Sequence, residues 1–154
     1  MLKPGSKAPT FSLHSDSGDR VSLADLKGKP VVLYFYPKDD TTGCTVEACE
    51  FRDSWAAVKR SGAVVLGVSP DPVGSHQKFK QKYSLPFPLL ADEDHAVAEA
   101  YGAWGDKSMY GRKYKGILRT TYLIDPQGRI AEVFQKVKPK GHAKQVLDAV
   151  GRIM

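Results

Sequence analysis

Two continuous apolar runs, residues 31–36 and 63–69, constrain the fold of this chain more than any other feature. Both runs are rich in β-branched and aromatic residues, which predicts strands that are buried on both faces. The residues between them have helical periodicity, which predicts a helix from about residue 42 to residue 60 that Ser61 and Gly62 close. A strand, a helix and a second strand in this order form a parallel β-α-β unit, so the chain is expected to have an α/β fold.

The other elements fit one domain over residues 1–154, a length at which a chain buries a sizeable core. Residues 102–116 have no clear periodicity, and a long loop with aromatic side chains often borders a site. In the N-terminal part we expect an extended segment over 1–12, two short strands joined by a turn at 14–19, and a short strand and a helical turn over 21–26. After the β-α-β unit we expect an exposed helix over 75–83, a short strand at or near a sheet edge over 85–91, and a short helix over 92–101. The C-terminal part is expected to form a strand over 118–124 with a hairpin partner over 129–135, and a terminal helix over 142–153.

Cys44 stands at the predicted start of the long helix, directly after the polar loop 38–43. The first turn of a helix has N–H groups without acceptors and the positive end of the helix dipole, and both favour a thiolate, the reactive form of cysteine. The apolar face that carries Cys44 continues through Ala48, Phe51, Trp55 and Val58. From the residues alone, Cys44 is either a reactive thiol or a small buried apolar residue of that face.

Cys49, the only other cysteine, lies off this apolar face. Five residues of an ideal helix rotate by about 140° and advance by about 7.5 Å, which places the two Cα atoms about 8–9 Å apart. A disulfide needs Cα atoms within about 7 Å of each other. If Cys44 and Cys49 pair, the first turns of the helix must therefore unwind. We predict a folded dithiol form and a locally unfolded disulfide form.

The string Pro37-x-x-x-Thr41-x-x-Cys44, placed directly after an apolar strand, is the active-site pattern of the peroxiredoxins, and this chain resembles that family. The sequence TVEAC that follows resembles the peroxiredoxin Q group, also called bacterioferritin comigratory proteins. The resemblance covers nearly the whole chain and includes residues 4–11, 67–69, 101–105 and 119–125. It implies a thioredoxin-like fold in which helices cover both faces of a mixed central sheet and an N-terminal β-hairpin is added.

The resemblance also implies a thiol peroxidase. Cys44 would attack a hydroperoxide, either hydrogen peroxide or an organic one, and become a sulfenic acid. Cys49 would resolve the sulfenic acid as a Cys44–Cys49 disulfide, and thioredoxin or a similar dithiol would reduce that disulfide. A helix-borne resolving cysteine needs no second subunit, and the group is often monomeric, so we expect a monomer.

Four further residues receive roles from the resemblance. Arg119 would be the catalytic cation, Glu47 would orient it, Thr41 would aim its hydroxyl at the reacting oxygen, and Pro37 would shield the thiolate from water. The backbone N–H groups of Gly43 and Cys44 would bind the substrate. The residues alone allow plainer roles, because Thr41 or Thr42 suits a helix N-cap, Glu47 suits the first turn, Pro37 ends a strand and Arg119 suits a surface.

Two other functions use the same cysteines. A thioredoxin-like disulfide reductase is disfavoured by the spacing, because that chemistry normally uses C-x-x-C and four residues separate the cysteines here. A non-enzymatic redox sensor would signal to a partner through its unwound helix. Peroxide turnover in the presence of thioredoxin separates the enzyme from the sensor.

Charge and composition narrow the partners and the compartment. The net charge is +6, but the basic residues are dispersed and no nucleic-acid motif accompanies them, so we expect no nucleic-acid partner; a basic face that steers an acidic protein stays open. No apolar run approaches the ~20 residues of a membrane span, and we expect no signal peptide. Two cysteines that pair transiently suit the reducing cytoplasm. We expect no metal or cofactor, because the histidines lack metal-ligand spacing and are expected at the surface: His14, His76, His95 and His142.

Overall fold

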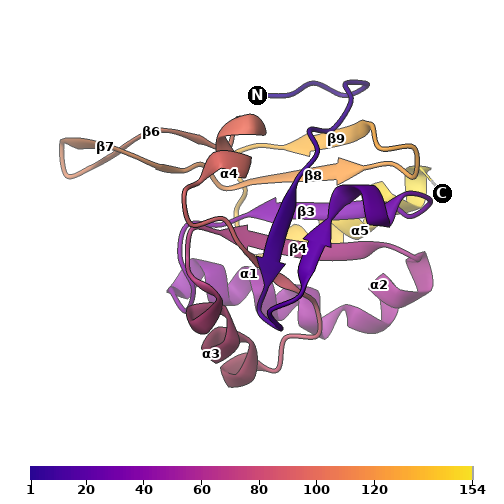
Figure 1. The fold of residues 1–154 in the computed structure, drawn as a ribbon, viewed down its shortest axis with the longest axis horizontal. Coiled ribbons are helices and arrows are strands. Elements are labelled where there is room, and N and C mark those ends of the chain that lie inside the picture. Colours follow the sequence, from indigo (N-terminus) through magenta and orange to yellow (C-terminus); the bar gives the residue numbers. More distant parts are fainter. Residues whose placement is uncertain (154) are drawn as a thin grey trace.

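The structure, a computed structural model, describes residues 1–153. Within these residues seven strands form one mixed sheet in the order β2-β1-β5-β4-β3-β8-β9, and two more strands form a separate hairpin (Figure 1). The strands are β1 (Ser12–Ser15), β2 (Arg20–Ser22), β3 (Val31–Phe35), β4 (Val64–Ser69), β5 (Leu89–Ala91), β6 (Trp104–Met109), β7 (Arg112–Ile117), β8 (Thr120–Ile124) and β9 (Ile130–Phe134). The helices are the 3₁₀ helix η1 (Leu23–Leu26), α1 (Thr42–Asp53), α2 (Trp55–Ser61), α3 (Val73–Tyr83), α4 (Ala96–Ala100) and α5 (His142–Ile153). Among the described residues, no helix is both long and apolar enough to cross a bilayer.

The predicted β-α-β unit is confirmed. β3 and β4 pair in parallel, and every residue of β3 is buried, as the continuous apolar run predicts. The connecting helix differs from the prediction, because it breaks at Ser54 into α1 and α2. Serine favours helix ends, since its side chain competes with the helical backbone for hydrogen bonds. Here the Ser54 backbone N–H still donates to the Glu50 carbonyl oxygen, at 3.1 Å.

Helices cover both faces of the sheet, as expected. On one face α1, α2 and α5 pack against alternate residues of β3, among them Tyr34, whose ring stacks on Phe51. On the other face the N-terminal segment, η1 and α4 cover the remaining alternate residues, including Phe35. Figure 1 shows α1 and α2 running below the sheet and α4 on the opposite side. The period-two alternation of a strand thus divides the core into two apolar clusters.

Gly67 gives a direct test of the packing in the first of these clusters. A Cβ atom added at Gly67 would lie 2.8 Å from the Tyr34 Oη and 3.1 Å from Leu89 Cδ2. We expect Gly67→Ala to lower the free energy of unfolding by about 1–3 kcal/mol, because the buried Tyr34 ring cannot move away. Gly74→Ala, in α3 with no atom within 4 Å of the added Cβ, is the control and should be neutral or stabilising. Urea unfolding of both variants measures the difference, and equal stabilities would contradict the packing.

The N-terminal hairpin changes the position of one predicted edge strand. β1 and β2 form the expected hairpin, and β1 also pairs with β5 through His14–Ala91 and Ser15–Leu90. β5 therefore lies inside the sheet, between β1 and β4, so the strand predicted at or near an edge lies near one and not at it. The two prolines that suggested an edge precede the strand, which begins only at Leu89, so they remove no donor from its ladder.

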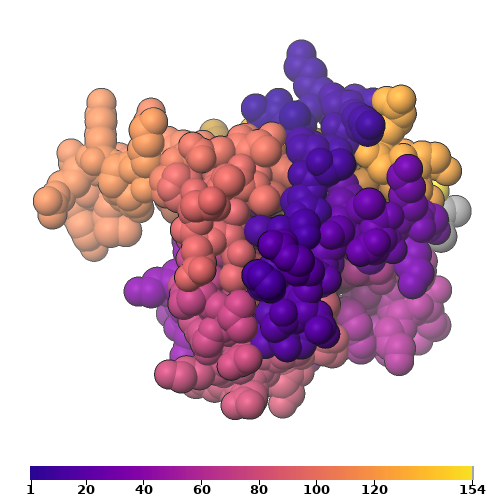
Figure 2. Space-filling model, in the orientation of Figure 1, coloured from indigo at the N-terminus to yellow at the C-terminus, as the bar shows by residue number. Residues whose placement is uncertain are grey.

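Residues 102–116, expected as an irregular loop, form the β6–β7 hairpin. Tyr110 and Gly111 at its tip have φ angles of 52° and 78°, the left-handed pair that a two-residue hairpin turn requires. Alternation was hard to see because most side chains of this hairpin are solvent-exposed on both faces. Figure 2 shows the hairpin, in orange, projecting from the body of the molecule.

Candidate active site

The register of the sheet places the predicted site residues side by side. β8 runs antiparallel to β3, and Phe35 at the end of β3 faces Thr120 at the start of β8. The chain beyond Phe35 continues into the loop and helix that carry Cys44, and the residue before Thr120 is Arg119. Two segments 75 residues apart therefore meet at one end of the sheet, where α1 begins.

Arg119 contacts both Cys44 and Glu47 at this end of the sheet. Its Nη2 donates to Cys44 Sγ at 3.2 Å, and its Nη1 donates to Glu47 Oε1 at 2.8 Å. Cys44 and Glu47 are each 1 % exposed, and the Arg119 side chain is 18 % exposed. Burial alone would lower the pKa of Arg119, but the negative charges of Cys44 and Glu47 outweigh it and raise that pKa above its ordinary value. The guanidinium is thus a permanent cation beside the sulfur.

The Glu47 carboxyl is held in an unusual environment. Burial raises its pKa from 4.5 to about 7, although the charge and the hydrogen bond of Arg119 oppose the rise. Its second oxygen, Oε2, is buried and has no hydrogen-bond partner among the described residues. Glu47 is therefore partly protonated at neutral pH and shares a single guanidinium with Cys44.

Glu47 makes stability depend on pH. Between about pH 4.5 and 7 the folded protein holds a proton that the unfolded chain has lost, so the free energy of unfolding falls as the pH rises through this range. We expect this group to cost about 3 kcal/mol of stability between the two ends of the range. Glu47→Gln should be free of that loss. Urea unfolding at several pH values compares the two proteins, and parallel pH profiles would contradict the raised pKa.

Thr41, the next of the predicted site residues, lies where the loop from β3 enters α1. Thr41 is the N-cap residue of α1, but its hydroxyl donates to the Lys38 carbonyl oxygen, at 2.9 Å, and makes no side-chain cap bond. The expectation that Thr41 or Thr42 is the helix N-cap is thus met by Thr41, although without a side-chain cap bond. The loop carbonyl competes successfully for the hydroxyl, because Thr41 is exposed and its side chain turns back along the loop.

Gly43 and Cys44 lie in the first turn of α1, whose N–H groups have no acceptors within the helix. Gly43 is close to Arg119, because an added Cβ would lie 3.3 Å from Arg119 Nη2 and 3.4 Å from Pro139 Cγ. Pro37 is half-buried and lies in the loop that connects β3 to the first turn of α1. The absence of a side chain at Gly43 thus leaves room for the guanidinium to approach the sulfur.

Cys49 lies in the same helix as Cys44, and both thiols are free. Cys49 is partly exposed, whereas Cys44 is buried. Burial raises the pKa of Cys49. Because both cysteines lie within the regular helix α1, five residues apart, a bond between their sulfurs requires that helix to open.

Sequence reasoning missed two neighbours of the site. Lys107, in the middle of β6, donates to the Ile117 carbonyl oxygen at 2.8 Å, and burial together with the Arg119 charge lowers its pKa. Lys107 and Arg119 line a surface hollow of about 290 Å³. Pro139 contributes the contact with Gly43 described above. Lys107 lies in segment 102–116, which is of the kind that often borders a site, but nothing marked this lysine itself. Pro139 carries no sequence signal, because it reaches the site only through the pairing of distant segments.

The expectation that all four histidines lie at the surface was wrong for two of them. His76 is 0 % exposed and His142 is 2 % exposed. His142 Nε2 lies 2.7 Å from Thr121 Oγ1, and the edge of its ring packs against Phe51. His76 lies on α3 and contacts Asp39. Their polar partners are distant in the sequence, which is why spacing alone could not reveal the burial.

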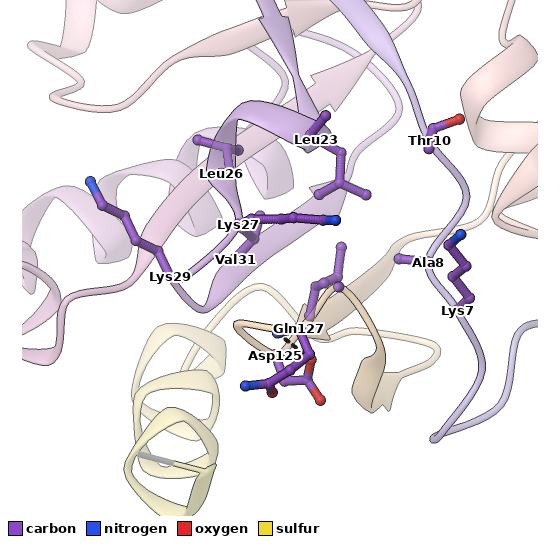
Figure 3. A pocket seen from close by; sticks show the side chains of 13 residues that line it. Lys7, Ala8, Thr10, Leu23, Leu26, Lys27, Lys29, Val31, Asp125 and Gln127 are labelled. Atoms are coloured by element: carbon purple, nitrogen blue, oxygen red, sulfur yellow. Dashed lines mark hydrogen bonds between the residues drawn. The ribbon is translucent and has the colours of Figure 1, made fainter.

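A second hollow lies at the opposite end of the sheet, where β3 begins. It has a volume of about 180 Å³ between the N-terminal segment, η1 and the turn after β8. Figure 3 shows Leu23, Val31 and Ala8 at its apolar lining, with the side chains of Lys7 and Lys27 around it. It contains no cysteine, so the reactive thiols belong to the other end of the molecule.

A thiol buried at a helix start, with a fixed cation against its sulfur, suits attack on an electrophilic oxygen, which is the chemistry of the cysteine-dependent peroxidases. The comparisons agree. Residues 4–133 match the AhpC/TSA family, and the chain belongs to it. It is 57 % identical to "Putative peroxiredoxin bcp" of Coxiella burnetii over 99 % of both chains, and 50 % identical to "Peroxiredoxin Bcp" of Bacillus subtilis over 97 % of this chain and 95 % of that one.

Solved structures give the same relationship. The bacterioferritin comigratory protein of Xanthomonas campestris, described in connection with alkyl peroxide reduction, superposes with a TM-score of 0.91 at 37 % identity, over 97 % of this chain and 98 % of that one. The resemblance to the peroxiredoxin Q group is thereby confirmed, and so is the thioredoxin-like peroxiredoxin fold.

Proposed function

We propose that Cys44 is the peroxidatic cysteine of this thiol peroxidase and that Cys49 is its resolving cysteine. The observation that carries the proposal is the 3.2 Å contact from Arg119 Nη2 to Cys44 Sγ. The same guanidinium donates its Nη1 hydrogen bond to Glu47, which fixes its position. A fixed cation at this distance stabilises a thiolate and remains in place as charge moves to the substrate oxygens.

In the first step the Cys44 thiolate attacks the nearer oxygen of a hydroperoxide. The S–O bond forms, the O–O bond breaks, and the leaving oxygen takes up a proton to give water or an alcohol. Arg119 and the N–H groups of Gly43 and Cys44 are the donors that meet the developing charge. Thr41 contributes its hydroxyl once substrate replaces the Lys38 carbonyl as its partner, and Pro37 adds no competing donor beside the sulfur.

In the second step the Cys49 thiol condenses with the Cys44 sulfenic acid. The sulfenic oxygen leaves as water and a disulfide forms within one chain. This step needs α1 to open, which also exposes Cys49 and removes the burial that keeps its thiol protonated. A dithiol protein then reduces the disulfide by thiol–disulfide exchange, and thioredoxin is the reductant that we propose.

The substrates, assembly and compartment follow from the same arguments. Both hydrogen peroxide and organic hydroperoxides carry the O–O bond that the site attacks, and the hollow beside Arg119 and Leu118 has room for an organic substituent. Because both cysteines lie on one helix, a monomer completes the cycle. A transient disulfide suits a reducing compartment, so we place the protein in the cytoplasm.

The test is peroxide turnover coupled to thioredoxin, thioredoxin reductase and NADPH. We expect NADPH consumption to continue through many turnovers with wild type and to be absent with Cys44→Ser. Rapid oxidation of Cys44 without sustained consumption would contradict the proposed cycle and would favour the redox sensor, whose disulfide passes to a specific partner.

A further inference from the structure

A buried polar contact outside the Cys44 group joins His76 of α3 to Asp39. His76 Nδ1 lies 2.8 Å from Asp39 Oδ2, and His76 Nε2 lies 3.0 Å from the Leu90 carbonyl oxygen. The imidazole is 0 % exposed and Asp39 is 8 % exposed. Nothing in the peroxide chemistry described above uses either side chain.

His76 Nδ1 and Asp39 Oδ2 lie at ion-pair distance, and we call this contact the His76–Asp39 ion pair. Both ring nitrogens of His76 face oxygen atoms within hydrogen-bond distance, so the ring is held between Asp39 and β5. Asp39 accepts two further bonds, from the Tyr36 hydroxyl at 2.6 Å and from Ser75 Oγ at 2.8 Å. Burial raises the pKa of Tyr36 well above its ordinary value, so its hydroxyl remains a donor. Asp39 is therefore tied to three side chains, from β3's end, from the start of α3 and from His76.

Asp39 lies inside the active-site motif, midway between Pro37 and Thr41. Its backbone N–H is also held, because it donates to Asp71 Oδ2 at 2.9 Å. The next residue, Asp40, has a left-handed backbone with φ of 58° and accepts bonds from Lys82 and Tyr83 of α3. α3 therefore holds the loop immediately upstream of α1, while α1 itself must open for the disulfide to form.

We propose that His76 is a positioning residue that acts through Asp39 and that their ion pair fixes the upstream limit of the opening of α1. This inference rests on the proposed Cys44–Cys49 cycle. With the ion pair intact, the loop presents Thr41 and the first turn of α1 in the closed arrangement that reacts with peroxide. The disulfide forms when the helix opens downstream of Asp39, while Asp39 stays attached to α3.

Opposite effects on the two steps distinguish this role from a merely structural one. When the ion pair is removed, the first turn of α1 is held less firmly and the open form is more populated. The rate of Cys44 oxidation should then fall by about tenfold, since small misplacements of reacting groups are costly. The rate of disulfide formation from the sulfenic acid should rise by about threefold or more, because it follows the open population.

The experiment compares His76→Gln with wild type and with His14→Gln, which changes an exposed histidine of β1. Stopped-flow mixing with hydrogen peroxide gives both rates, and hydrogen exchange reports on residues 38–44. We expect His76→Gln to slow the first step, accelerate the second and increase exchange in 38–44, with His14→Gln unchanged. Asp39→Asn should reproduce these effects, and adding His76→Gln to it should change little more.

Nitrogen NMR of the folded wild type gives a reading that depends on no variant. We expect Nδ1 and Nε2 of His76 both to be hydrogen-bonded, and a ring nitrogen without a hydrogen bond would overturn the contact with Asp39 or with Leu90. Equal rates and equal exchange in His76→Gln and wild type would overturn the positioning role. If wild type forms no Cys44–Cys49 disulfide, the proposed cycle fails, while the first-step rate and the hydrogen exchange still decide the role of His76 in the closed form.

Discussion

Replacing Arg119 by alanine is expected to slow the oxidation of Cys44 by hydrogen peroxide about 100- to 1000-fold, the loss that follows when one preorganised donor to a developing oxyanion is removed. Arg119 is the only side chain among the described residues that donates a hydrogen bond to Cys44 Sγ. Its removal takes away both the charge that stabilises the thiolate and a donor to the peroxide oxygens. Competition for peroxide with a reference thiol enzyme, or stopped-flow fluorescence, measures the rate.

Arg119→Ala also removes the cation that opposes the raised pKa of Glu47, so the buried carboxyl is more fully protonated and loses its hydrogen-bond partner, at a cost of about 1–3 kcal/mol. The double variant Arg119→Ala/Glu47→Gln replaces this titrating carboxyl with a neutral amide, so it tests the chemistry without a change in the protonation of Glu47. Arg119→Lys keeps the charge but loses the fork that binds Cys44 and Glu47 at once, and it should recover only part of the rate. Arg112→Ala, on the exposed part of the hairpin, is the control. A rate within about threefold of wild type in the double variant would contradict the assignment of Arg119.

Replacing Cys49 by serine is expected to separate the two halves of the cycle. The first turnover should keep its wild-type rate, because Cys49 takes no part in the hydrogen bonds that join Cys44, Arg119 and Glu47. Steady-state turnover with thioredoxin should fall below about 1 % of wild type, since no disulfide is available for exchange. NADPH oxidation after a single addition of peroxide gives both quantities.

The same variant identifies the product that accumulates. Cys49→Ser should stop as the Cys44 sulfenic acid, and excess peroxide should carry it on to the sulfinic acid, which mass spectrometry detects as added oxygen. Full cycling of Cys49→Ser would mean that the reductant attacks the sulfenic acid directly. The opening of α1 would then have no role in catalysis.

Much of this site was predictable from local sequence. The apolar run 31–36 predicts a buried strand, and a cysteine after the polar loop predicts a thiol at a helix start; both are observed. The boundary between α1 and α2 was harder to predict, because the helix is interrupted at Ser54, where no glycine or proline marks the interruption. Local patterns thus predicted those strands and helices that are determined mainly by residues adjacent in the sequence.

Contacts between distant segments were less predictable. The pairing of Phe35 with Thr120 brings Arg119 to Cys44, and only the family resemblance indicated it. The burial of His76 depends on Asp39, 37 residues away, so its spacing to other residues carried no signal. The raised pKa of Glu47 likewise arises from the burial of this α1 side chain, which the sequence of the helix alone does not reveal.

The most direct test of this account is peptide mapping, by mass spectrometry under non-reducing conditions, of the protein treated with one equivalent of hydroperoxide at low protein concentration. The account predicts a Cys44–Cys49 disulfide within a single chain, formed in step with the consumption of peroxide, and loss of hydrogen-exchange protection over α1 in that form. A disulfide between two chains, or a Cys44–Cys49 disulfide with α1 as protected as in the dithiol form, would contradict it.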